Sequence, residues 1–122
     1  MNKKIMVVDD DQDILKSLRQ FFEYEQFEVT CANNGKECLE ILEKGEKPDL
    51  ILLDIMMPKM SGWDVFYKIK EKIGCKQIPI VFLTAKSDKY SQGFGKFSAN
   101  DYITKPFEIQ ELKEKIERIL SG

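Results

Sequence analysis

The chain has 122 residues, 43% hydrophobic and 33% charged, which fits one globular domain over residues 1–122 and excludes a disordered chain. Its 19 basic and 21 acidic residues give a net charge of −2, which argues against direct binding to nucleic acid, because phosphate contacts need a concentrated basic face. The absence of histidine excludes a Ser-His-Asp or Cys-His catalytic group, a histidine metal site and a phosphohistidine on this chain.

The first part of the chain alternates between strand and helix patterns. The short apolar run Lys4–Val8 predicts a strand, and apolar residues at helical spacing predict a helix over Asp13–Glu25. Asp11 is suited to be the N-cap of that helix. A second strand is expected over Glu28–Ala32, and a second helix follows over Lys36–Lys44.

The middle of the chain repeats this alternation. Leu50–Leu53 is apolar at every position, as expected for a strand that is buried on both faces of a parallel sheet. Ser61 followed by Asp64 predicts a capping box at the start of a third helix, over Gly62–Ile73. A fourth strand is expected over Pro79–Leu83.

The last part of the chain adds two helices and one strand. Ser87–Phe97 fits a fourth helix, which Gly93 and Gly95 weaken. Asp101–Thr104 is expected to be the fifth strand, and Phe107–Leu120 the fifth helix. The regular alternation predicts an α/β fold, a three-layer α/β/α sandwich with a five-stranded parallel sheet and five helices.

Polar residues gather where the expected strands end, and in such a sheet ligands bind beyond the carboxyl ends of the strands. The residues that follow strands one, three, four and five are Asp9 and Asp10, Asp54, Thr84, and Lys105. Two carboxylates at about 5 Å repel by roughly 3 kcal/mol at an effective dielectric of about 20, so three of them call for protonation or a cation. Oxygen ligands alone favour Mg²⁺ or Mn²⁺. Such an ion and an ammonium group would together neutralise an incoming phosphoryl group, with a carboxylate as its nucleophile.

Each of these residues also has an ordinary structural interpretation. An aspartate after a strand is often a turn residue or a helix cap, which is the interpretation we prefer for Asp11. Thr84 could simply end a strand, and Lys105 could be a surface lysine whose neighbour Pro106 indicates a special backbone geometry such as a cis peptide bond. Asp54 directly follows an apolar run, so solvation explains it poorly. Their joint occurrence at the strand ends favours a functional site.

Four segments carry a family resemblance that extends over the whole chain: IMVVDDDQDIL, PDLILLDIMMPKMSGWDV, IPIVFLTAK and ANDYITKPF. In sequence and in order, they resemble the receiver domains of two-component response regulators. The resemblance implies the flavodoxin-like fold with strand order 2-1-3-4-5. It also implies a phosphorylation-dependent signalling switch that catalyses only its own phosphorylation and slow dephosphorylation, and is not a metabolic enzyme.

The resemblance implies roles for the residues at the strand ends. Asp54 is the phosphoacceptor. Asp9, Asp10 and Asp54 hold Mg²⁺ together with the backbone carbonyl of Met56. Position 56 varies in the family, and a backbone ligand is retained whatever its side chain. Lys105 pairs with the phosphoryl group.

The resemblance also implies how the switch works and what it contacts. Thr84 is the switch hydroxyl that bonds a phosphoryl oxygen, and Tyr102 is the switch aromatic that moves inward with it. The face formed by 87–97, 101–104 and 107–120 would change shape and control a downstream effector, and it could form a homodimer. The phosphoryl donor would be a sensor histidine kinase or a phosphotransfer protein. A stand-alone regulator and a receiver within a longer protein both fit.

Three other classes of protein were weighed against this one. A haloacid-dehalogenase-like phosphatase would use the DxD spacing of Asp9 and Asp11, but it would leave Asp54 and Lys105 unexplained. A receiver-like binding module that needs no phosphorylation is disfavoured because every site residue is present. A nucleotide-binding domain lacks both GxGxxG and GxxxxGK[ST].

The cysteines and the apolar runs indicate where the protein works. Cys31, Cys38 and Cys75 are odd in number and form no CxxC motif, so we expect free thiols and a reducing cytoplasm instead of disulfides or a zinc site. No apolar stretch reaches the length that spans a membrane, so no membrane contact is expected.

Overall fold

The structure is a computed structural model that describes residues 2–72, 74–85 and 101–122. Within these residues it contains five strands and four helices. Their bounds are β1 Lys4–Val8, α1 Gln12–Tyr24, β2 Glu28–Ala32, α2 Gly35–Glu43, β3 Leu50–Asp54, α3 Gly62–Glu71, β4 Ile80–Ala85, β5 Asp101–Lys105 and α4 Ile109–Ser121. The helix that the sequence predicts over Ser87–Phe97 lies outside the described residues.

All five strands run parallel in one sheet, in the order β2-β1-β3-β4-β5. The α/β fold and the strand order expected from the sequence are therefore confirmed. β1 and β3 are direct neighbours, with Val8 paired to Leu53. The residues that come next, Asp9 and Asp54, are thereby brought to the same edge of the sheet.

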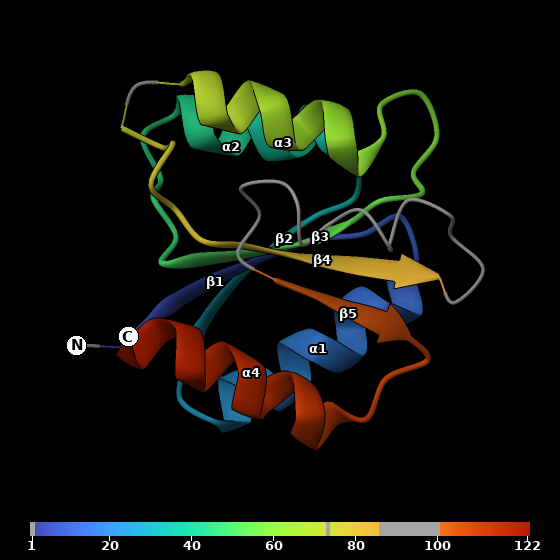
Figure 1. The fold of residues 1–122 in the computed structure, drawn as a ribbon, viewed down its shortest axis with the longest axis vertical. Coiled ribbons are helices and arrows are strands. Elements are labelled where there is room, and N and C mark those ends of the chain that lie inside the picture. Colours follow the sequence, from blue (N-terminus) through green and yellow to red (C-terminus); the bar gives the residue numbers. More distant parts are fainter. Residues whose placement is uncertain (1, 73, 86–100) are drawn as a thin grey trace.

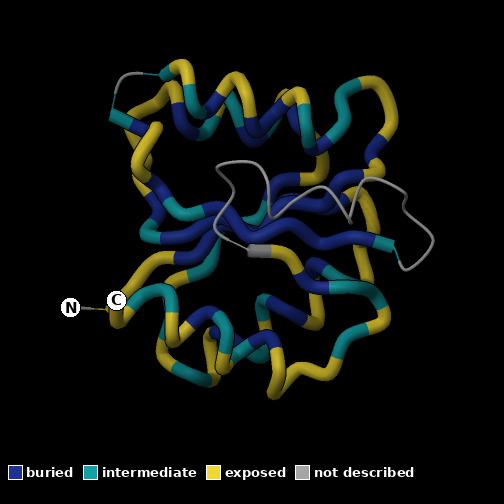
Figure 2. Tube along the Cα trace, viewed as in Figure 1, coloured by how far each residue is buried: buried dark blue, intermediate teal, exposed yellow. Residues whose placement is uncertain are grey.

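Helices cover both faces of the sheet, so the molecule has three layers (Figure 1). α1 and α4 pack on one face, and α2 and α3 on the other. Successive residues of β3 point to opposite faces of the sheet. Leu50 and Leu52 belong to the cluster under α1 and α4, while Ile51 and Leu53 belong to the cluster under α2 and α3. β3 is buried at every position, as its apolar sequence predicts, and the buried residues run through the middle of the molecule (Figure 2).

Polar caps fix where two of the helices begin. The side chain of Asp11 accepts hydrogen bonds from the backbone N–H groups of Asp13 and Ile14 at the start of α1. Ser61 and Asp64 form a reciprocal capping box at the start of α3. Both caps were expected from the sequence, and each satisfies backbone N–H groups that a helix end leaves without partners.

The element bounds differ from the sequence prediction mainly at the carboxyl edge. β3 extends to Asp54 and β4 to Ala85, so Asp54 and Thr84 are part of their strands and do not merely follow them. α4 begins at Ile109, after the N-cap Glu108, instead of at Phe107. Phe107 lies in the preceding loop and packs against the cluster under α1 and α4. No helix of the described residues has the length and apolar character that a membrane crossing requires.

Candidate functional site

Three carboxylates meet at the carboxyl edge of the sheet. Asp9, Asp10 and Asp54 each present an oxygen atom, and these atoms lie within 4.8 Å of one another. Asp9 has no exposed surface and Asp54 is 4% exposed, whereas Asp10 is open to solvent. The structure brings together the three residues that the sequence predicted to share a metal site, and that role stays a prediction.

Lys105 lies among the carboxylates. Its Nζ atom is 2.9 Å from Asp9 Oδ2 and 3.4 Å from Asp54 Oδ1. Lys105 is the last residue of β5, and the peptide bond to Pro106 is cis, as the proline suggested. The sequence placed Lys105 at this edge, but its ion pair with Asp9 was not anticipated. The two residues are 96 positions apart, and no local pattern reports such a contact.

The electrostatic balance of the cluster is visible in the pKa values of Asp54 and Lys105. The pKa of Asp54 is raised to about 7, first by burial and then by the charge of Asp9, while the charge and hydrogen bond of Lys105 act in the opposite direction. Burial lowers the pKa of Lys105, but hydrogen bonding to Asp9 and the charges of Asp54 and Asp9 outweigh it, so the net shift is upward. One ammonium group therefore does not balance the three carboxylates.

The residues present fit a hard divalent cation. The three donors are carboxylate oxygens, which Mg²⁺ and Mn²⁺ prefer, and they converge closely enough to share one ion. A second positive charge would oppose both the burial and the repulsion from Asp9 that raise the pKa of Asp54. Because Asp10 is exposed, the cluster is open to solvent on that side.

The loop after β3 is held by backbone hydrogen bonds. The N–H of Ile55 donates to Leu83 O of β4, while Ile55 O accepts from the N–H groups of Met57 and Gly62. Met56 stands between these contacts with 63% of its surface exposed. The side chain of Met56 is thus largely in solvent, and the role expected of its backbone carbonyl stays a prediction.

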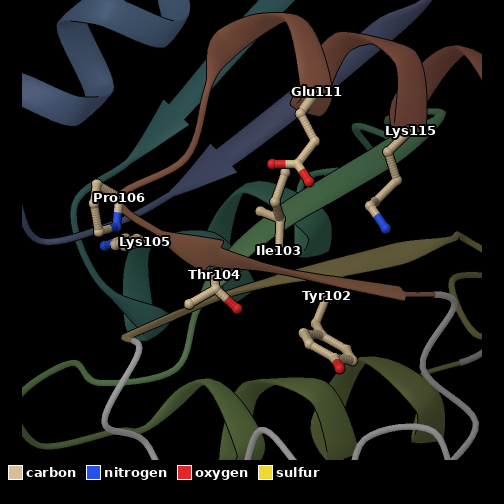
Figure 3. A pocket seen from close by; sticks show the side chains of 7 residues that line it. All are labelled: Tyr102, Ile103, Thr104, Lys105, Pro106, Glu111 and Lys115. Carbon is tan, nitrogen blue, oxygen red and sulfur yellow. The ribbon is translucent and has the colours of Figure 1, made fainter.

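The two residues expected to act as the switch lie on neighbouring strands. Thr84 is completely buried in β4, and its hydroxyl donates to Ala85 O at 3.3 Å. Tyr102 is in β5, 37% exposed, and projects from the side of the strand opposite to Ile103 (Figure 3). Their places on adjacent strands agree with the expected roles, which stay predictions.

A pocket of about 430 Å³ extends along β5 and the start of α4 (Figure 3). Its lining residues are Tyr102, Ile103, Thr104, Lys105, Pro106, Glu111 and Lys115. Lys105 lines this pocket and also forms ion pairs with Asp9 and Asp54, so the pocket adjoins the three carboxylates without being the same site.

Asp11 takes no part in the cluster. Its side chain caps α1, and its own backbone N–H donates to Asp9 Oδ1 at 3.0 Å. The DxD interpretation of Asp9 and Asp11, on which the dehalogenase-like alternative depends, therefore loses its second carboxylate to a structural role.

Comparisons with known proteins agree on one family. The family model described as "Response regulator receiver domain" matches residues 5–117. The alkaline phosphatase synthesis transcriptional regulatory protein PhoP of Bacillus subtilis is 40% identical over 121 residues, which are 98% of this chain and 49% of PhoP. The chain spans about half the length of the curated relatives it matches.

Solved structures give the same result. A response regulator of Chloroflexus aurantiacus described as putative aligns with a TM-score of 0.90 at 30% identity, covering 100% of both chains. The response regulator TrrA of Thermotoga maritima, solved in complex with Mg²⁺-BeF, aligns with a TM-score of 0.83 at 38% identity, covering 96% of this chain and 98% of TrrA.

Proposed function

Because the chain belongs to the response regulator receiver domain family, we propose that it is a signalling switch in which Asp54 accepts a phosphoryl group. One observation carries this proposal above the others. Asp54 is a buried carboxylate that lies beside Asp9, Asp10 and the ammonium group of Lys105. A carboxylate nucleophile needs neighbouring positive charge when a phosphate approaches, and this edge of the sheet supplies it.

The chemistry follows from the charges in the cluster. A carboxylate oxygen of Asp54 attacks the phosphorus atom, and the bond between phosphorus and the nitrogen of a donor phosphohistidine breaks. The leaving imidazole keeps the electron pair and takes up a proton. The nucleophile must be ionised, which Lys105 favours. Lys105 Nζ, 3.4 Å from Asp54 Oδ1, is within reach of a phosphoryl oxygen attached there.

We propose Mg²⁺, with Mn²⁺ as a substitute, as the cofactor of this step. Its ligands would be Asp9, Asp10, Asp54 and the backbone carbonyl of Met56, by the donor chemistry described above. When bound, the ion supplies positive charge to the phosphoryl oxygens. The solved complex of TrrA with Mg²⁺-BeF supports this assignment through a relative.

The switch would respond to the charge that phosphorylation adds. A phosphoryl group brings about −1.5 to −2 charge and three acceptor oxygens. The Thr84 hydroxyl, whose present hydrogen bond to Ala85 O is long at 3.3 Å, would turn to a phosphoryl oxygen. Tyr102 would then move inward from its partly exposed position. The expected switch face, of which the structure describes β5 and α4 while 87–97 lies outside the described residues, would shift in population toward its active form.

The partners follow from the family. The donor would be a sensor histidine kinase or a phosphotransfer protein, and the output a downstream effector protein or domain, or a homodimer formed through the switch face.

We place the whole chain, residues 1–122, in one receiver domain that works in the cytoplasm without metabolic turnover or direct contact with nucleic acid or membrane. Its three cysteines are free thiols, which agrees with a reducing compartment.

Treatment with acetyl phosphate and Mg²⁺, followed by mass spectrometry, tests the proposal. The wild type should gain a single phosphoryl adduct, and Asp54→Ala should gain none. Asp13→Ala, which removes an exposed carboxylate in α1, is the control and should behave as the wild type. The proposal fails if the wild type takes up no phosphoryl group or if Asp54→Ala is still modified. Steady hydrolysis of a phosphomonoester would point to an enzyme instead.

A further inference from the structure

Two helices of the molecule begin with a glycine. Gly35 is the first residue of α2 and follows the N-cap Asn34, while Gly62 is the first residue of α3 and follows the N-cap Ser61. Within helices glycine is less favourable than alanine, because it loses more backbone entropy on folding. A glycine at these two positions therefore suggests that a side chain would not fit, and the surroundings show why.

Gly62 lies directly on the backbone of the proposed phosphoacceptor. A Cβ atom at this position would lie 2.8 Å from Ile55 Cα and 3.0 Å from the carbonyl carbon of Asp54, and it would overlap Asp54 O. These are backbone atoms in and next to β3, so they cannot turn aside as a side chain can. In addition, the Gly62 N–H donates to Ile55 O at 2.8 Å. The first turn of α3 thus rests on the peptide group between Asp54 and Ile55.

Gly35 is packed just as closely but against different atoms. A Cβ atom there would lie 2.5 Å from Val65 Cγ2 and 2.9 Å from Met60 Sδ. Both contacts are with side chains, and the methionine in particular can take another rotamer. A substitution at Gly35 would therefore disturb the packing between α2 and α3, but it would not press on Asp54.

We propose that Gly62 is a positioning residue for phosphoryl transfer, one that sets the place of the Asp54 carboxylate by allowing α3 to lie against the Asp54 peptide group. Ile55 is fixed on its other side by the bond from its N–H to Leu83 O. A methyl group at position 62 must therefore displace either α3 or the end of β3. Displacement of β3 moves Asp54 and, beyond it, the carbonyl of Met56. This inference rests on the proposed function.

The test compares two single substitutions in the full chain, Gly62→Ala and Gly35→Ala. For each we would measure the free energy of unfolding in urea, the Kd for Mg²⁺, the Kd for beryllofluoride with Mg²⁺, and the phosphorylation rate with acetyl phosphate, all corrected for the folded fraction. A displacement of about 1 Å can lower a rate roughly 100-fold, so Gly62→Ala should lose at least ~10-fold in rate, with weaker Mg²⁺ binding. Gly35→Ala should lose stability but keep a phosphorylation rate and a Kd for Mg²⁺ near the wild-type values.

A second pair of variants keeps the test decisive if Gly62→Ala does not fold. Ser61→Ala removes the cap of α3 and loosens its first turn without adding an atom near Asp54, and Asn34→Ala does the same to α2. The Ser61 variant should bind Mg²⁺ more weakly than the Asn34 variant. Equal Mg²⁺ affinity in this pair, or equal losses in the two glycine variants, would overturn the role of Gly62. A wild type that takes up no phosphoryl group would instead overturn the proposed function.

Discussion

β3 has two parts that differ in what they bury: the apolar residues Leu50–Leu53 and the carboxylate of Asp54. Leu50–Leu53 bury aliphatic side chains under helices on both faces. One residue further, Asp54 buries a carboxylate, with the completely buried Asp9 just past the end of the neighbouring strand β1. The first arrangement lowers the free energy of the folded chain, because apolar surface leaves water. The second raises it, because charged groups lose their hydration. The site thus lies where folding is least favoured, and the apolar part of the strand must supply the stability.

Removing apolar volume from the interior of β3 should give the largest effect on stability. Leu52 is completely buried, so Leu52→Ala should lower the free energy of unfolding by about 2–5 kcal/mol. Urea denaturation measures this loss. If the two parts of the strand are independent, the folded variant will bind Mg²⁺ as the wild type does. A changed Mg²⁺ affinity would show that the site depends on core packing, and the comparison would no longer hold.

Removing the charge of Asp54 at the end of β3 should raise the free energy of unfolding, whereas Leu52→Ala lowers it. The pKa of Asp54 is raised from 3.8 to about 7 on folding, so the folded chain binds this proton more tightly than the unfolded chain. The contribution of Asp54 to the free energy of unfolding therefore falls by on the order of a few kcal/mol as the pH rises from about 4 to about 7. Above that pH the contribution stays low. Asp54→Asn should be more stable than the wild type at pH 8 without divalent cations.

The control for this prediction is Mg²⁺. The ion favours the ionised carboxylate, so saturating Mg²⁺ should remove most of the pH dependence in the wild type and leave Asp54→Asn little changed. Thermal unfolding at several pH values, with and without Mg²⁺, would measure both effects. A wild type that is as stable as Asp54→Asn at pH 8 in the absence of Mg²⁺ would show that burial of this carboxylate has no cost.

The smallest effect concerns an aspartate that belongs to the structure and not to the site. Asp11 caps α1, so Asp11→Ala should lower the free energy of unfolding by about 1 kcal/mol. Its phosphorylation by acetyl phosphate should remain close to that of the wild type, which the same mass spectrometric assay can follow. Loss of phosphorylation in a stable Asp11→Ala variant would show that Asp11 belongs to the functional site and does not serve the structure alone.

The sequence was sufficient for features that depend on local patterns. Strand and helix periodicity predicted the alternation of elements, and short-range motifs predicted the caps at Asp11 and Ser61. Because ligands bind at the carboxyl ends of parallel strands, the sequence also predicted that Asp54 and Lys105 lie at the same edge of the sheet. The strand order, in contrast, came from family resemblance, because periodicity does not say which strands are neighbours.

Features that depend on distances across the fold could not be read from the sequence. The ion pair between Lys105 and Asp9 joins residues from β5 and from the end of β1. The contact of Gly62 with the Asp54 peptide group depends on how closely α3 approaches β3. The shift in the pKa of Asp54 depends on how much of its carboxylate is buried. Each is a property of packing that no short segment encodes.

The span between Asp9 and Lys105 also has a consequence during synthesis. Asp9 leaves the ribosome early, but its lysine partner is among the last residues of the sheet to be translated, and it reaches Asp9 only after β5 has joined β4. A growing or truncated chain that ends before β5 carries the acidic groups without their counter-charge. We therefore expect the proposed phosphorylation of Asp54 to require a chain that has been synthesised through β5.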